Sequence, residues 1–254
     1  MVELLASGRT AEVFAWGDGR VLKLDRPDWN GLSAFEAAAL ATLADTGVPA
    51  PRLHETVTVG DRHGVVIDRV DGPILADVVN AAADLEPLAT TWIELHQSVN
   101  AHVVTGLPDL VTGLADGVQS SGLGAPLVEE LLALLDDVDD GRRALCHFDL
   151  HPGNVIVGAD GWVVIDWMTA SSGPPDADFA RTLVLDAPNS VSARGRFMAL
   201  VATTGAEERG IDRLQLADWV RIIAGARLAE GFEGEHADYL TSLAAGTRHL
   251  GGSL

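Results

Sequence analysis

The chain has 254 residues, of which 47% are apolar and 21% are charged. That composition can bury one large domain or two small lobes, and it is too apolar for a disordered chain. Its 17 basic and 37 acidic residues give a net charge of -20. Such a charge argues against nucleic acid or an anionic membrane as a partner, because phosphates would be repelled, and it permits cationic substrates and metal ions.

The cysteine content and the first residues bear on the compartment. Cys146 is the single cysteine, so no internal disulfide can form. The chain does not open with a basic segment followed by a long apolar run, as a signal peptide would. It also has no uncharged apolar stretch of about 18 residues, the length that spans a bilayer. We therefore expect a soluble cytoplasmic protein without a membrane partner.

All but one of the 17 basic residues are arginines, and the exception is Lys23. A chain that uses arginine wherever a cation is needed can keep its one lysine where a compact ammonium on a flexible stem is required. Chance explains a lone lysine equally well, so Lys23 is only a candidate at this point.

The N-terminal part of the chain is expected to be rich in β-structure. Turn signals, including Gly17-Asp18-Gly19, separate short apolar segments, which is typical of an antiparallel meander. Ser33 is a good N-cap for a helix that Gly47 ends. The predicted strands cover residues 2–6, 12–16, 20–24, 52–59 and 64–67, and the predicted helix covers residues 33–45.

A break at 71–73 predicts a lobe boundary near residue 70, and the rest of the chain has mainly helical patterns. Residues 105–125 are rich in Gly and Ser, and their pattern favours no element. We expect two domains, a β-rich lobe at 1–70 and a mainly helical lobe at 71–254. The helices predicted in the second lobe cover residues 74–83, 88–99, 126–135, 178–185, 192–202, 214–230 and 237–245.

The segment 147–166 has the strongest chemical pattern. Two short apolar runs, 155–157 and 163–165, flank an Asp-Gly turn signal and predict a β-hairpin. Asn154 and Asp166 lie equally far from Asp160, so we expect them side by side at the open end, with Asp149 five residues before Asn154. Oxygen ligands at this density suit Mg²⁺, and a carboxylate free of metal can orient a hydroxyl. Phosphoryl transfer needs this combination of positioning and charge neutralisation.

These residues resemble a known family. The run H-F-D-L-H-P-G-N at 147–154, followed by I-D-W, looks like the aminoglycoside phosphotransferase and choline-kinase-like family, a branch of the protein-kinase fold. Residues 36–52 and 173–181 are also similar to segments of that family, and the resemblance covers residues 1 to about 185. It implies an α+β, two-lobed protein-kinase-like fold, with a small antiparallel β lobe carrying one helix and a larger, mainly helical lobe.

The resemblance also implies roles for single residues. Asp149 would be the catalytic base or hydroxyl-orienting group, and Asn154 and Asp166 would hold Mg²⁺. Lys23 would contact the phosphates of ATP or GTP, with Glu36 holding it in place. The loop over the phosphates would be Ser7, Gly8, Arg9 and Thr10, and the strand that meets adenine would be Asp68, Arg69 and Val70.

Local structure alone can account for one of these residues, and two segments depart from the family pattern. Glu36 stands three residues after Ser33, so a capping box accounts for it without any contact to Lys23. The phosphate loop has one glycine instead of three, so the hydroxyls of Ser7 and Thr10 would assist. Position 174 is Pro where relatives often have Asp, which favours Asp178, as a helix N-cap, over Asp176.

We therefore expect a Mg²⁺-dependent kinase that phosphorylates a hydroxyl of a small molecule, with an aminoglycoside or amino sugar as the first candidate acceptor. Glu230 and Glu233 are the candidates for contacting a cationic acceptor. The alternatives are a catalytically silent, nucleotide-binding regulator with a kinase-like fold, and a zinc hydrolase using His147, Asp149 and His151. A monomer and a homodimer are both compatible with the sequence.

Overall fold

The computed structural model describes residues 3–185 and 192–250. The chain divides into two compact units. The first comprises Met1–Leu75, Val104–Leu107 and Pro152–Ala170, and the second comprises Ala76–Val103, Pro108–His151 and Ser171–Leu254. Residues 152–170, which we assigned to the C-terminal lobe, thus group with the N-terminal unit. The division into 1–70 and 71–254 stays a prediction.

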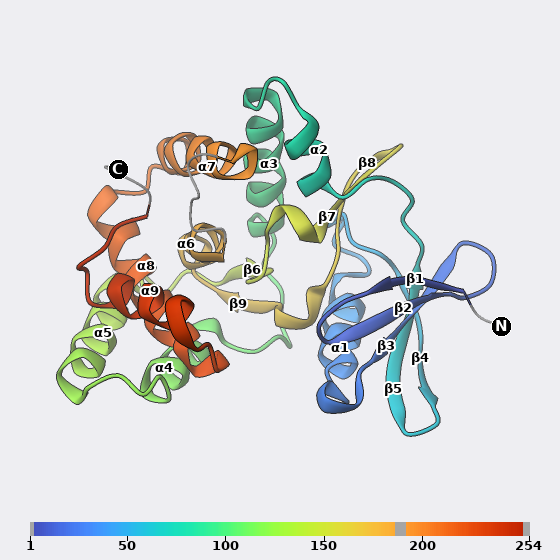
Figure 1. Cartoon of the computed structure of the whole chain (residues 1–254), viewed down its shortest axis with the longest axis horizontal. Helices are drawn as coiled ribbons and strands as arrows, with labels where there is room; N and C mark the ends of the chain where they lie inside the picture. Colours follow the sequence, from blue (N-terminus) through green and yellow to red (C-terminus); the bar gives the residue numbers. More distant parts are fainter. Residues whose placement is uncertain (1–2, 186–191, 251–254) are drawn as a thin grey trace. The chain divides into compact units, whose positions relative to one another are not determined.

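The first unit is built on a five-stranded antiparallel sheet of order β1-β2-β3-β5-β4 (Figure 1). Its strands lie close to the predicted segments. They are β1 (Leu4–Ser7), β2 (Ala11–Ala15), β3 (Arg20–Asp25), β4 (Leu53–Val59) and β5 (Arg62–Asp68).

The two faces of this sheet pack against different parts of the first unit. On one face, Leu22, Leu24 and Val66 form a small core that Phe14 and Val57 help to cover. Helix α1 (Ser33–Leu43) packs against β3, β4 and β5. Because side chains alternate along a strand, Lys23 points away from the small core and toward α1.

The first unit also contains the hairpin of β7 (Val155–Gly158) and β8 (Gly161–Val164), with the 3-10 helices η1 (Pro27–Trp29), η2 (Pro152–Asn154) and η3 (Trp167–Thr169). Helix α1 packs on η3, which directly follows Asp166. The open end of the hairpin therefore lies next to α1, the same helix that Lys23 faces.

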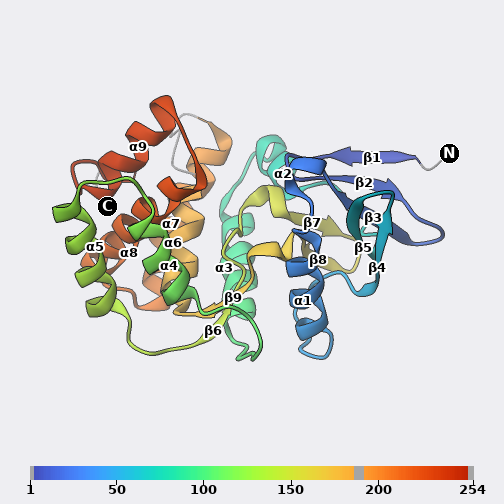
Figure 2. The ribbon, with the colours of Figure 1, turned by 90° about the horizontal axis from the view of Figure 1, so that it is seen from below.

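The second unit is mainly helical, and α8 is at its centre. This helix buries Trp219, Ile222 and Ile223 and packs against α4, α5, α6 and α9, which surround it in Figures 1 and 2. A short antiparallel pair, β6 (Ala144–Cys146) with β9 (Ser171–Gly173), adds a small sheet. The helices are α2 (Leu75–Ala81), which begins at the end of the first unit, α3 (Glu86–Asn100), α4 (Leu110–Gln119), α5 (Ala125–Val138), α6 (Pro175–Leu185), α7 (Ala193–Arg209), α8 (Arg213–Arg227), η4 (Leu228–Glu230) and α9 (Gly234–Ala244).

Three expectations about elements are corrected. Residues 105–125 contain α4, which Asp109 caps by accepting a hydrogen bond from the Thr112 amide. The strands β6 and β9 were missed, since three residues carry too little pattern to show a strand. Ser33 is the first residue of α1 and not its N-cap. Within the described residues, each helix is too short or too polar to cross a bilayer.

Candidate active site

Lys23 is held between two carboxylates of the first unit. Its Nζ lies 2.7 Å from Glu36 Oε2 and 2.7 Å from Asp166 Oδ1. The Lys23 side chain is 13% exposed and that of Glu36 is 2% exposed, so this ion pair is shielded from water, whereas Asp166 is 29% exposed. The lone lysine therefore contacts Glu36, its predicted partner, and also Asp166, which was predicted only as a metal ligand.

The backbone explains why Glu36 can reach this position. The buried carboxylate of Asp25 accepts hydrogen bonds from the amides of Gly31 and Ser33 and from the Ser33 hydroxyl. The Ser33 amide thus donates to Asp25, whereas in a capping box it would donate to Glu36. Glu36 binds Lys23 and accepts a hydrogen bond from the Trp167 amide, which ties α1 to the end of the hairpin.

Electrostatics keep the ammonium of Lys23 charged. Burial alone lowers its pKa, but the neighbouring charges of Glu36 and Asp166 act in the opposite direction and prevail, so the pKa of Lys23 is raised above its ordinary value. Asp166 adopts a left-handed backbone conformation, with φ of 67°. Residues other than glycine rarely adopt it, and it often marks functional positions.

Asn154 and Asp166 lie at the open end of the β7–β8 hairpin, as expected, but the predicted register is off by one residue. Val155 pairs with Val164 and the Ile165 amide donates to the Asn154 carbonyl, so Asn154 lies opposite Ile165 and Asp166 is one step further on. The reason is the turn, whose two central residues are Ala159 and Asp160, so that its centre falls between them and not on Asp160.

The donor atoms at this end of the hairpin fit Mg²⁺. Asn154, which is 8% exposed, brings an amide oxygen, and Asp166 brings a carboxylate one residue beyond the Asn154–Ile165 pair. Such hard oxygen donors, completed by water and phosphate oxygens, are the usual environment of Mg²⁺ in proteins. Among the described residues no group of three or more His, Cys, Asp or Glu side chains forms a metal site, so the zinc interpretation has no support there.

The predicted phosphate loop is a tight turn that Arg26 supports. The Gly8 amide donates to the Ala11 carbonyl, and Arg26 donates to the Gly8 carbonyl and to the Ser7 hydroxyl. The Arg26 amide also donates to the Thr10 carbonyl, and the Arg9 guanidinium lies 5.4 Å from the centre of the Trp29 ring.

In the predicted adenine strand, two amides already have partners. The Asp68 amide donates to the Arg52 carbonyl, and the Arg69 amide donates to the Gly19 carbonyl. The Asp68 carboxylate also contacts His54 Nε2 at 2.6 Å. The amides of Asp68 and Arg69 therefore have partners within the first unit, and the contact of the Asp68–Val70 backbone with adenine stays a prediction.

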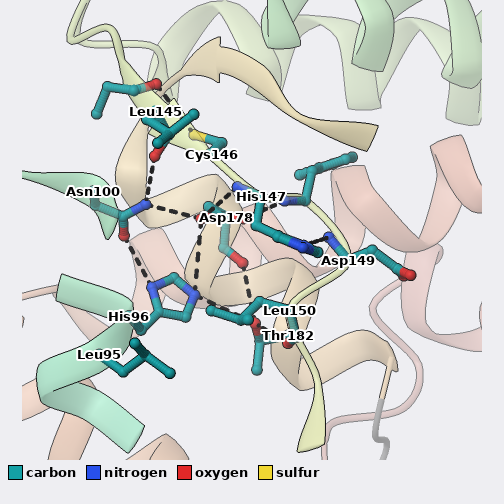
Figure 3. A network of polar contacts seen from close by, with 12 residues as sticks. Leu95, His96, Asn100, Leu145, Cys146, His147, Asp149, Leu150, Asp178 and Thr182 are labelled. Atoms are coloured by element: carbon teal, nitrogen blue, oxygen red, sulfur yellow. Dashed lines mark hydrogen bonds and ion pairs between the residues drawn. The ribbon is translucent and has the colours of Figure 1, made fainter. Parts of the chain in front are cut away.

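In the second unit, the segment that carries Asp149 is fixed by Asp178 (Figure 3). The fully buried Asp178 carboxylate accepts hydrogen bonds from the Phe148 amide at 2.8 Å and the His147 amide at 3.3 Å. Phe148 has φ of 58°, so the residue directly before Asp149 is in a left-handed conformation. The predicted role of Asp178 as an N-cap is wrong, because Asp178 lies inside α6 and its carboxylate accepts from the amides of His147 and Phe148. Its neighbour Asp176 binds Arg142 at 2.6 Å.

A buried network continues from Asp178 and braces both ends of this segment (Figure 3). Asn100 donates to Asp178 and to the Leu145 carbonyl, and the Thr182 hydroxyl donates to the Leu150 carbonyl. His96 lies 3.3 Å from Thr182 through Nε2 and 2.6 Å from Arg209 Nη2 through Nδ1. Burial, followed by the charge of Arg209, lowers the pKa of His96 well below its ordinary value, so the ring is neutral.

The two acidic residues predicted to contact the acceptor differ in their surroundings. Glu230 ends η4, and its Oε1 lies 2.7 Å from Arg181 Nη1 and 3.5 Å from Arg227 Nε. Glu233 is exposed at the N-cap position of α9. The charge of Glu230 is therefore already balanced by arginine.

Sequence reasoning missed Asn100, Thr182 and Arg209, and only the i, i+4 spacing of His96 and Asn100 on one helix face could have indicated a pair.

Comparisons with known proteins identify the family of the chain. Residues 2–216 match the model of a phosphotransferase enzyme family. The chain belongs to this family. The predicted family and the predicted class of enzyme, a small-molecule kinase, are thereby confirmed. A comparison with curated protein sequences found no significant match.

Solved structures with the same fold have low sequence identity to the chain. A thermostable mutant of aminoglycoside phosphotransferase APH(4)-Ia, in ternary complex with AMP-PNP and hygromycin B, has a TM-score of 0.70 at 16% identity, over 96% of this chain and 92% of the other. A GDP complex of an aminoglycoside 2'-phosphotransferase-IIIa mutant has a TM-score of 0.66 at 18% identity, over 97% and 92%. APH(3'')-Id from Streptomyces rimosus ATCC10970 has a TM-score of 0.59 at 19% identity, over 89% and 92%. These similarities confirm the predicted kinase-like α+β fold.

Proposed function

We propose that this phosphotransferase moves the γ-phosphate of ATP or GTP to a hydroxyl of a small molecule, with Mg²⁺ as cofactor. The observation that carries the proposal is the position of Lys23, whose ammonium lies 2.7 Å from both Glu36 and Asp166. A fixed cation beside a carboxylate that can bind metal is what the phosphates of a nucleotide require.

In this proposal Lys23 binds the phosphate oxygens, and Glu36 keeps its stem and charge in place from the buried side. Asn154 and Asp166 hold Mg²⁺, which when bound neutralises charge on the phosphates. Asp166 Oδ1 contacts Lys23, so the same carboxylate serves the ammonium and the cation. The loop at Ser7–Thr10 covers the phosphates, and the backbone of Asp68–Val70 meets the base.

Asp149 orients the acceptor hydroxyl and accepts its proton. As the acceptor oxygen forms a bond to the γ-phosphorus, the bond from that phosphorus to the β,γ-bridging oxygen breaks, and the nucleoside diphosphate leaves. The Asp149 side chain is 28% exposed, so an acceptor can reach it, while Asp178 and Thr182 hold the backbone on either side. Fixing the base in this way lowers the entropic cost of aligning it with the hydroxyl.

The acceptor is a separate question. The net charge and the family resemblance favour a cationic polyol such as an aminoglycoside or an amino sugar, and this stays a prediction, as do cytoplasmic localisation and a monomeric or homodimeric state.

Binding and turnover test the proposal together. We expect AMP-PNP to bind in a Mg²⁺-dependent manner, and we expect a panel of hydroxylated metabolites and aminoglycosides to contain at least one compound that releases ADP from ATP. Asp149→Asn should abolish that release and keep nucleotide binding. Wild-type protein that binds neither ATP nor GTP would overturn the proposal.

A further inference from the structure

Two arginines of the second unit are buried around a single carboxylate. Arg181 on α6 and Arg227 at the end of α8 are each 6% exposed. Both approach one oxygen of Glu230, at 2.7 Å from Arg181 Nη1 and at 3.5 Å from Arg227 Nε. Two positive charges therefore share this one negative charge.

Several donors of these guanidinium groups have no hydrogen-bond partner. Among the described residues, Arg181 Nε and Arg227 Nη1 are buried and make no hydrogen bond, and Arg227 Nε is only within ion-pair distance of Glu230, at 3.5 Å. Burial of a charged donor without a partner is costly, and proteins normally avoid it. An acidic chain has carboxylates to spare, and Arg142 contacts both Asp140 and Asp176. Arg209 Nε is also buried without a hydrogen bond, but Arg209 Nη2 contacts His96 and Asn100, whereas Arg181 and Arg227 share the single carboxylate of Glu230.

The cluster contacts the residue directly before the candidate base. The Arg181 guanidinium stacks 4.9 Å from the centre of the Phe148 ring, and Phe148 directly precedes Asp149. Burial lowers the pKa of Arg227, Arg181 lowers it further, and the charges of Glu230 and Asp149 oppose both. On the other side, the Arg227 guanidinium lies 4.8 Å from the centre of the Phe232 ring.

We propose that the acceptor carries an anionic group, a carboxylate or a phosphate, which Arg181 and Arg227 bind while Asp149 takes its hydroxyl. This inference rests on the proposed kinase function and specifies its substrate class. A planar guanidinium fork matches carboxylate and phosphate oxygens and forms charge-assisted hydrogen bonds with them. Aminoglycosides have no such group, so the charge of the whole chain is a poor guide to the charge at this position.

The direction in which a Glu230 substitution changes ligand binding tests the proposal. If Glu230 served a cationic acceptor, removing its charge would weaken binding. Under our proposal Glu230 competes with the incoming anion for the same two guanidinium groups. Glu230→Gln should then tighten anion binding, while Glu207→Gln, an exposed change on α7, should leave it as in the wild type.

The experiment compares probes that differ in the anionic group. Thermal unfolding is followed with D-gluconate against D-glucitol and with D-glucose 6-phosphate against D-glucose, at constant ionic strength set with NaCl, both with and without saturating AMP-PNP and Mg²⁺. We expect one of the anionic probes to raise the unfolding midpoint above its neutral counterpart. Arg227→Gln should weaken that probe roughly 30-fold, as loss of one partner of a buried charge pair does, while Arg213→Gln, an exposed change on the same helix, should not.

Several outcomes would overturn the proposal. The first is an equal unfolding midpoint with anionic and neutral probes in the wild type. The second is loss of the anion effect when AMP-PNP is present, which would assign the arginines to the nucleotide. The third is stabilisation by kanamycin A that Glu230→Gln weakens. If Arg227→Gln does not fold, Arg227→Lys and Glu230→Gln still decide. Failure of the kinase function looks different: the anion effect and its response to Glu230→Gln persist, and no acceptor of any class releases ADP.

Discussion

Lys23 Nζ lies 2.7 Å from Asp166 Oδ1, although 143 residues separate the two in the chain. The contact joins strand β3 to the residue that follows the β7–β8 hairpin, and Glu36 completes it from α1. Burying an ammonium with two carboxylates costs desolvation free energy, and such clusters of ionised groups are typical of functional sites. This arrangement therefore favours a binding role over a structural one.

Replacing Lys23 by arginine should be damaging even though the charge is kept. The guanidinium is wider than the ammonium and cannot approach Glu36 and Asp166 from the same point. We expect kcat to fall at least about 100-fold, because the phosphates would be misplaced. Steady-state kinetics of ADP release measure this, and full activity of Lys23→Arg would remove the special role of the lone lysine.

Asp166→Asn tests the metal ligand. The amide is a weaker ligand than the carboxylate for a hard dication, so the Mg²⁺ concentration for half-maximal activity should rise at least about tenfold. A Mg²⁺ titration of turnover gives the value, and Asp160→Asn in the exposed hairpin turn is the matched control. An unchanged Mg²⁺ requirement in Asp166→Asn would contradict the assignment.

Asp178 should act on catalysis through the backbone of the segment that carries Asp149. In Asp178→Asn one oxygen remains to accept from the Phe148 amide, but the charge that favours two amides and Asn100 is lost. We expect kcat to fall roughly 100-fold through misplacement of the base, with little change in nucleotide affinity. Equal losses in kcat and in AMP-PNP affinity would indicate general disruption.

The neutral state of His96 predicts a pH dependence of stability. Because its pKa is lowered in the folded protein, the unfolded chain binds the extra proton between the folded pKa and about 6.5, and the folded state is destabilised as the pH falls through that window. The loss is at most about 1.4 kcal/mol per pH unit.

Urea denaturation at pH 7.5 and pH 5.5 measures this effect. The pKa of Asp178 is raised by burial, which acts in the opposite direction, so the comparison that isolates His96 is between the wild type and His96→Gln. The wild type should lose more stability than the variant on acidification. Identical losses would mean that His96 does not titrate as described.

Much of the first unit could be predicted because its signals are local. Turn residues mark the meander, alternation places Lys23 on the face opposite Leu22 and Leu24, and the hairpin brings Asn154 near Asp166. The predicted register was wrong by one residue because it depends on the turn type, which one Asp-Gly pair does not specify.

The support of Asp149 could not be predicted in the same way. Asn100, Thr182 and Arg209 are common residue types on three different helices, and only tertiary packing brings them to the carbonyls of Leu145 and Leu150 and to His96. The surroundings of Glu230 also needed the structure, since nothing local links Arg181 to a residue 49 positions later.

Calorimetric titration of AMP-PNP into the wild type and Lys23→Met, each with and without Mg²⁺, tests most directly whether Lys23 holds the phosphates. We predict tight, Mg²⁺-dependent binding to the wild type and a loss of at least about tenfold in Lys23→Met. Equal affinity of the two proteins for AMP-PNP would show that the phosphates are held elsewhere, and it would contradict the proposed nucleotide site.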